Sequence, residues 1–347
     1  MLNFAVRDEI LQLFRPDLSE EEFAVGALRQ LRRQAADNPV YGRFLSGLGL
    51  DPLKLANWQD FPALPVSAFR EQAVCCFPSE QAKAVFETSG TTENKTGRHY
   101  FKDLRYYEKS LLAGFKLFMP DLLNHRWISL VPTFEQKPIS SLGYMIDYLG
   151  RSIPWGGCQS FCNANYEIDF DRLAKALDDA NDEGIPVALF GTSFALATIG
   201  EVFQERHQNW RLADNSVIFD TGGYKGRRRE LTTNELIALL VSVFGFSVDN
   251  IINEYGMTEL STPGYAKLGE GIHRFPPWLK VLIRDPLTGN ICRPGERGLV
   301  QLYDLANVGS VMAIGTLDSA VYEQDGIRLL GRVAVADLRG CSLPYEV

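Results

Sequence analysis

The residues best suited to phosphate chemistry lie in one short run, Glu87-Thr88-Ser89-Gly90-Thr91-Thr92-Glu93-Asn94-Lys95. Four hydroxyls and a glycine occupy the five consecutive positions from Thr88 to Thr92, and a lysine follows. Hydroxyls and exposed backbone N–H groups donate to phosphate oxygens, and Gly90 permits a close approach of the backbone. Lys95 adds a positive charge that suits a triphosphate or pyrophosphate. The alternative interpretation of the run by itself is a solvated Ser/Thr loop.

Two common nucleotide signatures are absent. A Walker A loop has a glycine immediately before its lysine, and this chain has Asn94 there. No G-x-G-x-x-G run follows a predicted strand, and Gly222-Gly223 is too short to replace one. The run therefore belongs to neither of these phosphate-binding classes.

A second stretch combines an aromatic ring, a glycine, a hydroxyl and a carboxylate. It reads Asn253-Glu254-Tyr255-Gly256-Met257-Thr258-Glu259 and follows the apolar pair Ile251-Ile252. A strand that delivers these groups into a loop offers a nucleotide purine stacking, phosphate contact and Mg²⁺ coordination. The alternative is a strand end followed by an exposed polar turn.

A third group lies toward the end of the chain, where Asp318 follows Thr316-Leu317 and Arg332 follows Leu330-Gly331. A carboxylate such as Asp318 accepts hydrogen bonds from both ribose hydroxyls. A guanidinium such as that of Arg332 reaches phosphate or ribose oxygens as a fork. Taken singly, each of these residues is more often a surface or turn residue.

The hydrophobic pattern predicts the elements that position these groups. Ser19 and Glu22 form a capping box before a helix that Asn38-Pro39 ends. Further helices are predicted over 104–119 and 170–182, after 193 and after the capping pair Thr232 and Glu235. Strands are predicted over 126–131, 186–190 and 216–220. This alternation indicates a mostly parallel sheet covered on both faces, whereas short β segments and turns from 262 to 333 indicate a smaller antiparallel barrel or sheet.

Composition limits the class of protein. A chain of 347 residues exceeds what one hydrophobic core usually organises, so two or three subdomains are expected. Hydrophobic residues make up 46% and charged residues 22%, as in ordinary globular proteins. The net charge of −8 argues against nucleic acid or an anionic membrane as the main partner.

Targeting and metal signals are also weak. The first nine residues lack an apolar signal-peptide core, and the longest apolar stretch, 236–246, is too short for a membrane span. Six cysteines form no C-x-x-C pair and only four histidines exist, which argues against zinc. A cytoplasmic protein with reduced thiols is the simplest expectation.

These segments, in this order, resemble the adenylate-forming superfamily of acyl-CoA synthetases, peptide-synthetase adenylation domains and luciferases. The resemblance covers roughly residues 85–340 and rests on four motifs in the family's order. It implies an α/β fold, namely the adenylate-forming N-terminal-domain fold with helix-covered, largely parallel sheets and a smaller β-barrel-like subdomain. It also implies ATP and Mg²⁺ as cofactors.

The resemblance assigns roles residue by residue. The pyrophosphate loop would comprise Thr88, Ser89, Gly90, Thr91 and Thr92 with Lys95. The adenine pocket would comprise Gly222, Gly223, Glu254, Tyr255 and Gly256, with Tyr255 stacking on the base. Thr258 would contact the α-phosphate, Glu259 the Mg²⁺ and Asp318 the ribose, and Arg332 would make the next nucleotide contact.

Two departures from the superfamily pattern accompany the match. Glu93 stands where the loop usually has glycine, which puts a negative charge near the phosphates. The chain also ends fifteen residues after Arg332, whereas the superfamily usually continues into a mobile C-terminal domain of about a hundred residues that carries a catalytic lysine. The sequence therefore predicts an enzyme without that domain.

A narrower resemblance lies in three segments: Asp220-Thr221-Gly222-Gly223-Tyr224-Lys225-Gly226-Arg227, Asp304-Leu305-Ala306-Asn307 and Asp337-Leu338-Arg339-Gly340-Cys341-Ser342-Leu343. They are similar to LuxE-like acyl-protein synthetases, which activate a carboxylic acid as acyl-AMP and take the acyl group onto a cysteine near the C-terminus. That family supplies fatty acids to a reductase in bacterial bioluminescence. The resemblance implies Cys341 as the nucleophile, on a flexible tail and with Arg339 lowering its pKa. The alternative is a small buried cysteine without a role.

The predicted organisation has four parts: a helical or irregular region over 1–84, an α/β nucleotide- and acid-binding subdomain over 85–261, a small β subdomain over 262–333 and a tail over 334–347. The predicted activity is ATP-dependent activation of a carboxylic acid, with a fatty acid favoured, followed by transfer to Cys341 and on to an acyl-thioester reductase or another acyl-accepting protein. Phe134, Ser140-Ser141 and Gly191-Thr192-Ser193 are candidates for the acid pocket. Direct transfer to CoA or a carrier protein, and a non-catalytic nucleotide-binding scaffold, remain as alternatives.

Overall fold

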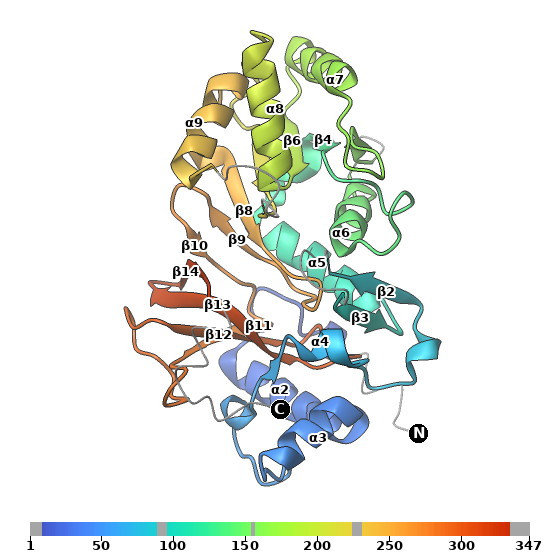
Figure 1. The fold of residues 1–347 in the computed structure, drawn as a ribbon, viewed down its shortest axis with the longest axis vertical. Coiled ribbons are helices and arrows are strands. Elements are labelled where there is room, and N and C mark those ends of the chain that lie inside the picture. The colour runs from blue at the N-terminus through green and yellow to red at the C-terminus, as the bar shows by residue number, and fades with distance from the viewer. Residues whose placement is uncertain (1–8, 89–95, 154–156, 224–230, 334–347) are drawn as a thin grey trace. The chain divides into compact units, whose positions relative to one another are not determined.

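The computed structural model describes residues 9–88, 96–153, 157–223 and 231–333, which fall into two units (Figure 1). Unit 1 takes in the chain up to Leu117, Met257–Pro263 and the residues from Ile272 onward. Unit 2 consists of Phe118–Gly256 and Gly264–Gly271. Each unit has its own hydrophobic cluster, and unit 2 is inserted into the chain of unit 1.

This division differs from the boundaries that the sequence predicts. Residues 85–117 belong to unit 1 rather than to the parallel sheet, because Ser110 hydrogen-bonds Thr262 (Oγ to Oγ1, 2.7 Å) and accepts from Trp278 Nε1 at 2.8 Å. Residues 264–271 belong to unit 2, because the strand that opens them pairs with the last parallel strand of that unit. The predicted tail, 334–347, lies outside the described residues.

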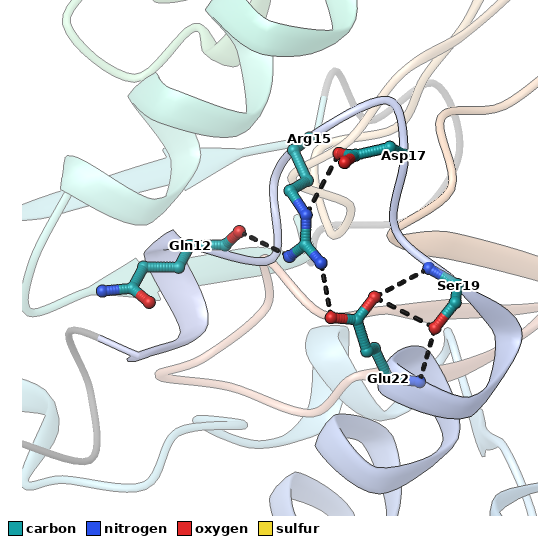
Figure 2. Close-up of polar contacts among 5 residues, drawn as sticks. All are labelled: Gln12, Arg15, Asp17, Ser19 and Glu22. Atoms are coloured by element: carbon teal, nitrogen blue, oxygen red, sulfur yellow. Dashed lines mark hydrogen bonds and ion pairs between the residues drawn. The ribbon is translucent and has the colours of Figure 1, made fainter.

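The first long helix of unit 1, α2 (Glu20–Asp37), begins as its capping box predicts. Ser19 Oγ accepts from Glu22 N at 3.2 Å, and the Glu22 carboxylate accepts from Ser19 N at 3.0 Å. Figure 2 shows Arg15 joining this cap to Asp17, with guanidinium contacts of 2.5 Å to Glu22 and 3.1 Å to Asp17. Side-chain caps of this kind stabilise a helix by about 1 kcal/mol.

Asn38 ends α2 and also begins α3 (Pro39–Gly47), since its side-chain oxygen accepts from Val40 N and Tyr41 N. The predicted irregular connection that follows contains only short elements. These are η1 (Trp58–Asp60), β1 (Leu64–Pro65), α4 (Ala68–Glu71) and η2 (Ser79–Gln81). The hairpin of β2 (Ala84–Glu87) and β3 (Arg98–Phe101) comes next, before α5 (Arg105–Phe118), which ends two residues before Pro120.

The main sheet of unit 1 is antiparallel, as the sequence predicts for 262–333. It runs in the order β10-β14-β13-β12-β11, and β1 adds a parallel pairing to β13. The strands are β10 (Ile272–His273), β11 (Leu279–Arg284), β12 (Gly298–Asp304), β13 (Ala313–Glu323) and β14 (Gly326–Arg332). Across β13 and β14 the register places Asp318 opposite Arg332.

Unit 2 contains the predicted parallel sheet, in the order β5-β4-β6-β7-β8-β9. Its strands are β4 (Arg126–Ser129), β5 (Gln159–Ser160), β6 (Val187–Gly191), β7 (Val217–Asp220), β8 (Ile251–Tyr255) and the antiparallel β9 (Gly264–Lys267). Its helices are α6 (Ser141–Gly150), α7 (Phe170–Glu183), α8 (Ser193–Glu205) and α9 (Thr233–Phe244), with the short η3 (Pro120–Asn124) and η4 (Val248–Asn250). Each predicted strand and helix of this region lies within a few residues of its observed bounds.

The parallel register brings two polar residues, Asp220 and Asn253, beside Gly191 at the carboxyl end of this sheet. Gly191 at the end of β6 pairs with Asp220 at the end of β7, and Asp220 pairs with Asn253 on β8. The carboxyl ends of neighbouring parallel strands are the usual place for ligand sites in such sheets. This edge therefore carries the candidate residues of unit 2.

Within the described part of the chain, no helix is long and apolar enough to cross a membrane. Among the described residues, the cysteines at 75, 76, 158, 162 and 292 form no disulfide.

Candidate active site

Asp220 connects the strand ends at the edge of the unit 2 sheet. Its carboxylate is 3% exposed and accepts hydrogen bonds from Ser193 Oγ at 2.6 Å, Gly222 N at 2.9 Å and Asn253 Nδ2 at 3.2 Å. These donors come from the start of α8, the turn after β7 and the adjacent strand β8. One carboxylate thus fixes three neighbouring segments.

The turn that Asp220 holds contains Gly222 and Gly223, which the sequence assigns to the adenine pocket. Gly222 and Gly223 have φ angles of +73° and +87°, which residues other than glycine rarely adopt. The two glycines have no Cβ atoms, so a flat ligand can come close to the backbone there. The structure therefore gives a reason for glycine at both positions.

Glu254 is the second carboxyl group in this region. Burial, and to a smaller extent the negative charge of Asp220, raises the pKa of Glu254 to about 8. Burial also raises the pKa of Asp220, against its three hydrogen bonds. Gly256 lies directly beside the Glu254 carboxyl, because a Cβ at Gly256 would meet Glu254 Oε1 at 2.1 Å. Tyr255 is partly exposed at the end of β8.

In unit 1 the predicted pyrophosphate loop starts and ends at a closed hairpin base, formed by Thr88 and Gly97. Thr88 N donates to Gly97 O at 2.9 Å, and Gly97 N donates to Thr88 Oγ1 at 2.8 Å. The hairpin base continues the pairing of β2 with β3, whose last pair joins Glu87 to Arg98. Both ends of the predicted loop are therefore fixed by the same four atoms. Ser89, Gly90, Thr91, Thr92 and Lys95 lie outside the described residues, as does Glu93.

Glu259 lies beside this hairpin base, although the two are far apart in the sequence. A Cβ at Gly97 would meet Glu259 Oε1 at 3.0 Å and Thr88 Cγ2 at 3.2 Å, so glycine at this position lets the two side chains lie close to the hairpin base. The Glu259 residue is 4% exposed, and burial raises the pKa of its carboxyl group. The guanidinium groups of Arg70 and Arg332 lower that pKa again.

This environment fits a magnesium ion in one limited sense. Mg²⁺ is usually held by one or two carboxylates together with substrate phosphates and water, and Glu259 supplies one buried carboxyl group beside Thr88 and Gly97. Within the described residues no group of three or more His, Cys, Asp or Glu side chains could hold a metal ion by themselves. A magnesium ion here would need the phosphates of the nucleotide as further ligands.

Asp318 and Arg332 form an ion pair across β13 and β14, with 3.1 Å between Arg332 Nε and Asp318 Oδ1. The Asp318 side chain is 16% exposed and that of Arg332 is 64% exposed. Asp318 N also donates to Thr316 Oγ1 at 3.1 Å, which fixes the backbone before the carboxylate. The structure thus brings together two predicted nucleotide contacts that are distant in the sequence.

Several residues near these candidates had no role in the sequence-based assignment. His99 Nδ1 lies 3.0 Å from Thr258 O, and Asn307 Nδ2 donates to Glu259 O at 2.9 Å. Asp304 accepts from Ser261 N at 3.0 Å. Asp304 and Asn307 belong to a segment that the sequence marks only by its family resemblance, and no sequence signal identifies His99.

The candidates for the acid pocket have structural roles in unit 2. Thr192 caps α8 by accepting from Ala195 N, and Ser140 caps α6 by accepting from Gly143 N. The Ser193 hydroxyl donates to Asp220. Cys341, the predicted acyl acceptor, lies outside the described residues.

Comparison with known proteins gives one family. The family described as acyl-protein synthetase, LuxE, matches residues 159–346. No curated protein sequence matches the chain.

Solved structures of adenylate-forming enzymes are similar in fold. A 2-hydroxyisobutyryl-CoA ligase in the postadenylation state is 13% identical, with 93% of this chain and 70% of that chain covered and a TM-score of 0.68. McyG A-PCP, complexed with phenylalanyl-adenylate, is 15% identical, with 74% and 48% covered and a TM-score of 0.52. O-succinylbenzoate coenzyme A synthetase from Bacillus subtilis, in complex with AMP, is 15% identical, with 74% and 50% covered and a TM-score of 0.50. The predicted adenylate-forming α/β fold is confirmed.

Proposed function

The chain belongs to the LuxE acyl-protein synthetase family and is a carboxylate-adenylating ligase, and we propose that it makes an acyl-AMP from a fatty acid and passes the acyl group through Cys341 to a partner protein. The observation that carries this proposal is the position of Glu259 beside Thr88 and Gly97. A carboxylate suited to Mg²⁺ thereby lies at the base of the loop assigned to pyrophosphate. The departure of pyrophosphate from MgATP requires both a ligand for the metal ion and a loop that binds the pyrophosphate.

In the first step, a carboxylate oxygen of the acid attacks the α-phosphorus of ATP. The new bond joins that oxygen to phosphorus, and the bond from the α-phosphorus to the bridging oxygen of pyrophosphate breaks. We assign Lys95 and the Thr88–Thr92 hydroxyls to the departing pyrophosphate and Thr258 to the α-phosphate. A magnesium ion held by Glu259 would neutralise charge on the phosphates.

The remaining nucleotide contacts follow from the same assignment. Tyr255 would stack on adenine beside the turn that Asp220 holds, and Glu254 and Gly256 would complete that pocket. Asp318 would accept from the ribose hydroxyls and Arg332, its ion-pair partner, would reach the next oxygen. A groove of about 320 Å³ near the hairpin base is lined in part by Arg70, Glu71, Thr96 and Arg98.

In the second step, the Cys341 thiolate attacks the acyl carbonyl carbon of acyl-AMP. A carbon–sulfur bond forms, the bond from the carbonyl carbon to the phosphate oxygen breaks, and AMP leaves. The thioester then passes the acyl group to a partner, for which an acyl-thioester reductase is the favoured class. The free enzyme returns when that partner accepts the acyl group.

The test has two parts. Exchange of labelled pyrophosphate into ATP, measured across fatty, aryl and short acids, should depend on an acid and be highest with a fatty acid. Labelled acid with ATP should then label the wild-type protein but not Cys341→Ser, while both proteins catalyse exchange. Label that persists in Cys341→Ser would assign the acyl group to another acceptor, and absence of exchange with every acid would contradict adenylation itself.

A further inference from the structure

The segment from Thr258 to Thr262 is held through its backbone by side chains from other parts of unit 1. His99, on β3, contacts the carbonyl oxygen of Thr258 at 3.0 Å across 159 residues of sequence. Asn307, after β12, donates to the carbonyl oxygen of Glu259 at 2.9 Å across 48 residues. Two consecutive carbonyls are therefore fixed, and they belong to the two residues assigned to the α-phosphate and Mg²⁺.

His99 is suited to this contact by its surroundings. It is 1% exposed, and its ring lies 4.1 Å from that of Phe101 and 5.9 Å from that of Phe69, centroid to centroid. A carbonyl oxygen only accepts, so Nδ1 must carry the proton. Burial lowers the pKa of His99 to about 4, and the imidazole is therefore a neutral donor at pH 7.

Asn307 is equally constrained. It is 1% exposed, and its Nδ2 donates to Val311 O at 3.1 Å as well as to Glu259 O. Both amide protons are used, so the amide cannot rotate without losing a hydrogen bond. The backbone of Asn307 is itself fixed, because its carbonyl oxygen accepts from Gln34 Nε2 of α2 at 2.7 Å.

Asp304 extends the same contact toward the end of the segment. Its carboxylate accepts from Ser261 N at 3.0 Å and from Thr262 Oγ1 at 2.7 Å. It also accepts from Ala306 N at 2.8 Å, which fixes the turn that carries Asn307. The family-like segment Asp304–Asn307 therefore contacts residues 259, 261 and 262 and holds its own turn in shape.

We infer that His99 and Asn307 are positioning residues for adenylation, which fix the backbone of Thr258 and Glu259 and so determine where those two side chains point. The inference rests on the proposed function. Because the carbonyl oxygens of Thr258 and Glu259 are hydrogen-bonded, the backbone at these two residues is fixed, and their side chains can change only by rotation about their own bonds. The segment therefore needs less rearrangement when phosphate and metal bind. Both residues act through the backbone carbonyls of Thr258 and Glu259, and neither is assigned a contact with the nucleotide.

If His99 and Asn307 only stabilised the fold, the loss of any similar buried hydrogen bond would lower activity as much as their substitution does. The control variant must therefore lose a similar buried hydrogen bond elsewhere in unit 1. Ser310 provides it: it is 1% exposed, lies in the same part of the chain as Asn307, and donates from Oγ to Val74 O at 2.9 Å. Ser310→Ala removes that bond without affecting residues 258–262. His99→Asn keeps an N–H close to the position of Nδ1, whereas His99→Leu removes it.

The experiment combines pyrophosphate exchange with hydrogen–deuterium exchange of the peptide that spans 257–263. We expect Asn307→Ala and His99→Leu to lower kcat for pyrophosphate exchange by about 10- to 100-fold. Deuterium uptake in that peptide should be faster in both variants. His99→Asn should recover most of the activity, and Ser310→Ala should stay within about twofold of the wild type.

The possible failures are distinguishable. If the wild type catalyses exchange and Asn307→Ala behaves like Ser310→Ala in both measurements, the positioning role is wrong and the proposed function stands. If His99→Asn is as impaired as His99→Leu, the donor at Nδ1 is not what matters, and the assignment of His99 is wrong. If the wild type shows no pyrophosphate exchange with any of the acids, the proposed function fails, and the positioning role fails with it.

Discussion

The two units place carboxyl groups in opposite electrostatic settings. In unit 2, Glu254 faces Asp220, and burial together with this like charge raises the pKa of Glu254 to about 8. In unit 1, burial raises the pKa of Glu259, but the guanidinium groups of Arg70 and Arg332 oppose the shift. The charge of Asp220 therefore adds to the effect of burial on Glu254, whereas the guanidinium charges oppose the effect of burial on Glu259, whose pKa is still raised.

The way each region is fixed also differs. In unit 2, one carboxylate, Asp220, holds the ends of neighbouring strands and the turn that follows its own strand. In unit 1, residues 258–262 depend on His99, Asp304 and Asn307, which lie on other strands and loops. Local geometry of a parallel sheet is enough for the first arrangement, whereas the second requires the packed tertiary structure.

The largest expected effect comes from Asp220→Ala. This substitution removes the carboxylate that accepts from the Ser193 hydroxyl and the Gly222 amide, and each unsatisfied group costs about 1 kcal/mol or more. It also removes one of the two acceptors of the Asn253 amide, which keeps its bond to the carbonyl oxygen of residue 220. We expect the free energy of unfolding, measured in urea, to fall by about 3 kcal/mol. Ser193→Ala removes one of these bonds and should cost about 1 kcal/mol. Equal losses in the two variants would show that Asp220 does not connect the three segments.

A pH series tests the electrostatic difference. Between pH 5 and 8, folded Glu254 keeps a proton that the unfolded chain has released, so its contribution makes stability fall as pH rises, by at most about 1.4 kcal/mol per pH unit. Glu254→Gln should remove this slope, and its advantage over the wild type should therefore grow toward pH 8. Glu259→Gln should change the slope less, because Arg70 and Arg332 favour its ionised form. Parallel stability curves for wild type and Glu254→Gln would contradict the neutral carboxyl of unit 2.

The smallest stability effect is expected at the exposed ion pair of unit 1. Asp318→Ala should change the free energy of unfolding by less than about 1 kcal/mol, because Arg332 is largely exposed. Its affinity for ATP, measured by calorimetry, should fall about tenfold or more through loss of the ribose contacts. Arg328→Ala breaks a comparable pair with Glu323 and should affect neither quantity. Unchanged ATP affinity in Asp318→Ala would refute the ribose assignment.

Local sequence patterns predict much of this architecture. The capping boxes at Ser19 and Thr232 mark helix starts correctly, since each depends on residues only three positions apart. The alternation of strands and helices predicts the parallel sheet of unit 2, because parallel strands need long crossover connections. The change to short strands separated by turns predicts the antiparallel sheet of unit 1.

Contacts between distant segments escape this kind of prediction. The hairpin base at Thr88 and Gly97 encloses the predicted loop, yet nothing in either residue's neighbours indicates that Glu259 lies beside it. His99 stands between Arg98 and Tyr100 with no pattern that points to Thr258. The unit boundaries differ for the same reason, because the bonds of Ser110 to Thr262 and Trp278 depend on packing.

The contact between Gln34 and Asn307 has a consequence for synthesis on the ribosome. The two residues are 273 positions apart, and at roughly 5–20 residues per second the second follows the first by roughly 15–55 seconds. During that interval the inward-facing amides of α2 have no partners among residues 305–312, whereas unit 2, whose last residue is Gly271, is translated in full before the interval ends. We therefore expect the inserted unit to fold first during translation, and the unit that begins the chain to be completed last.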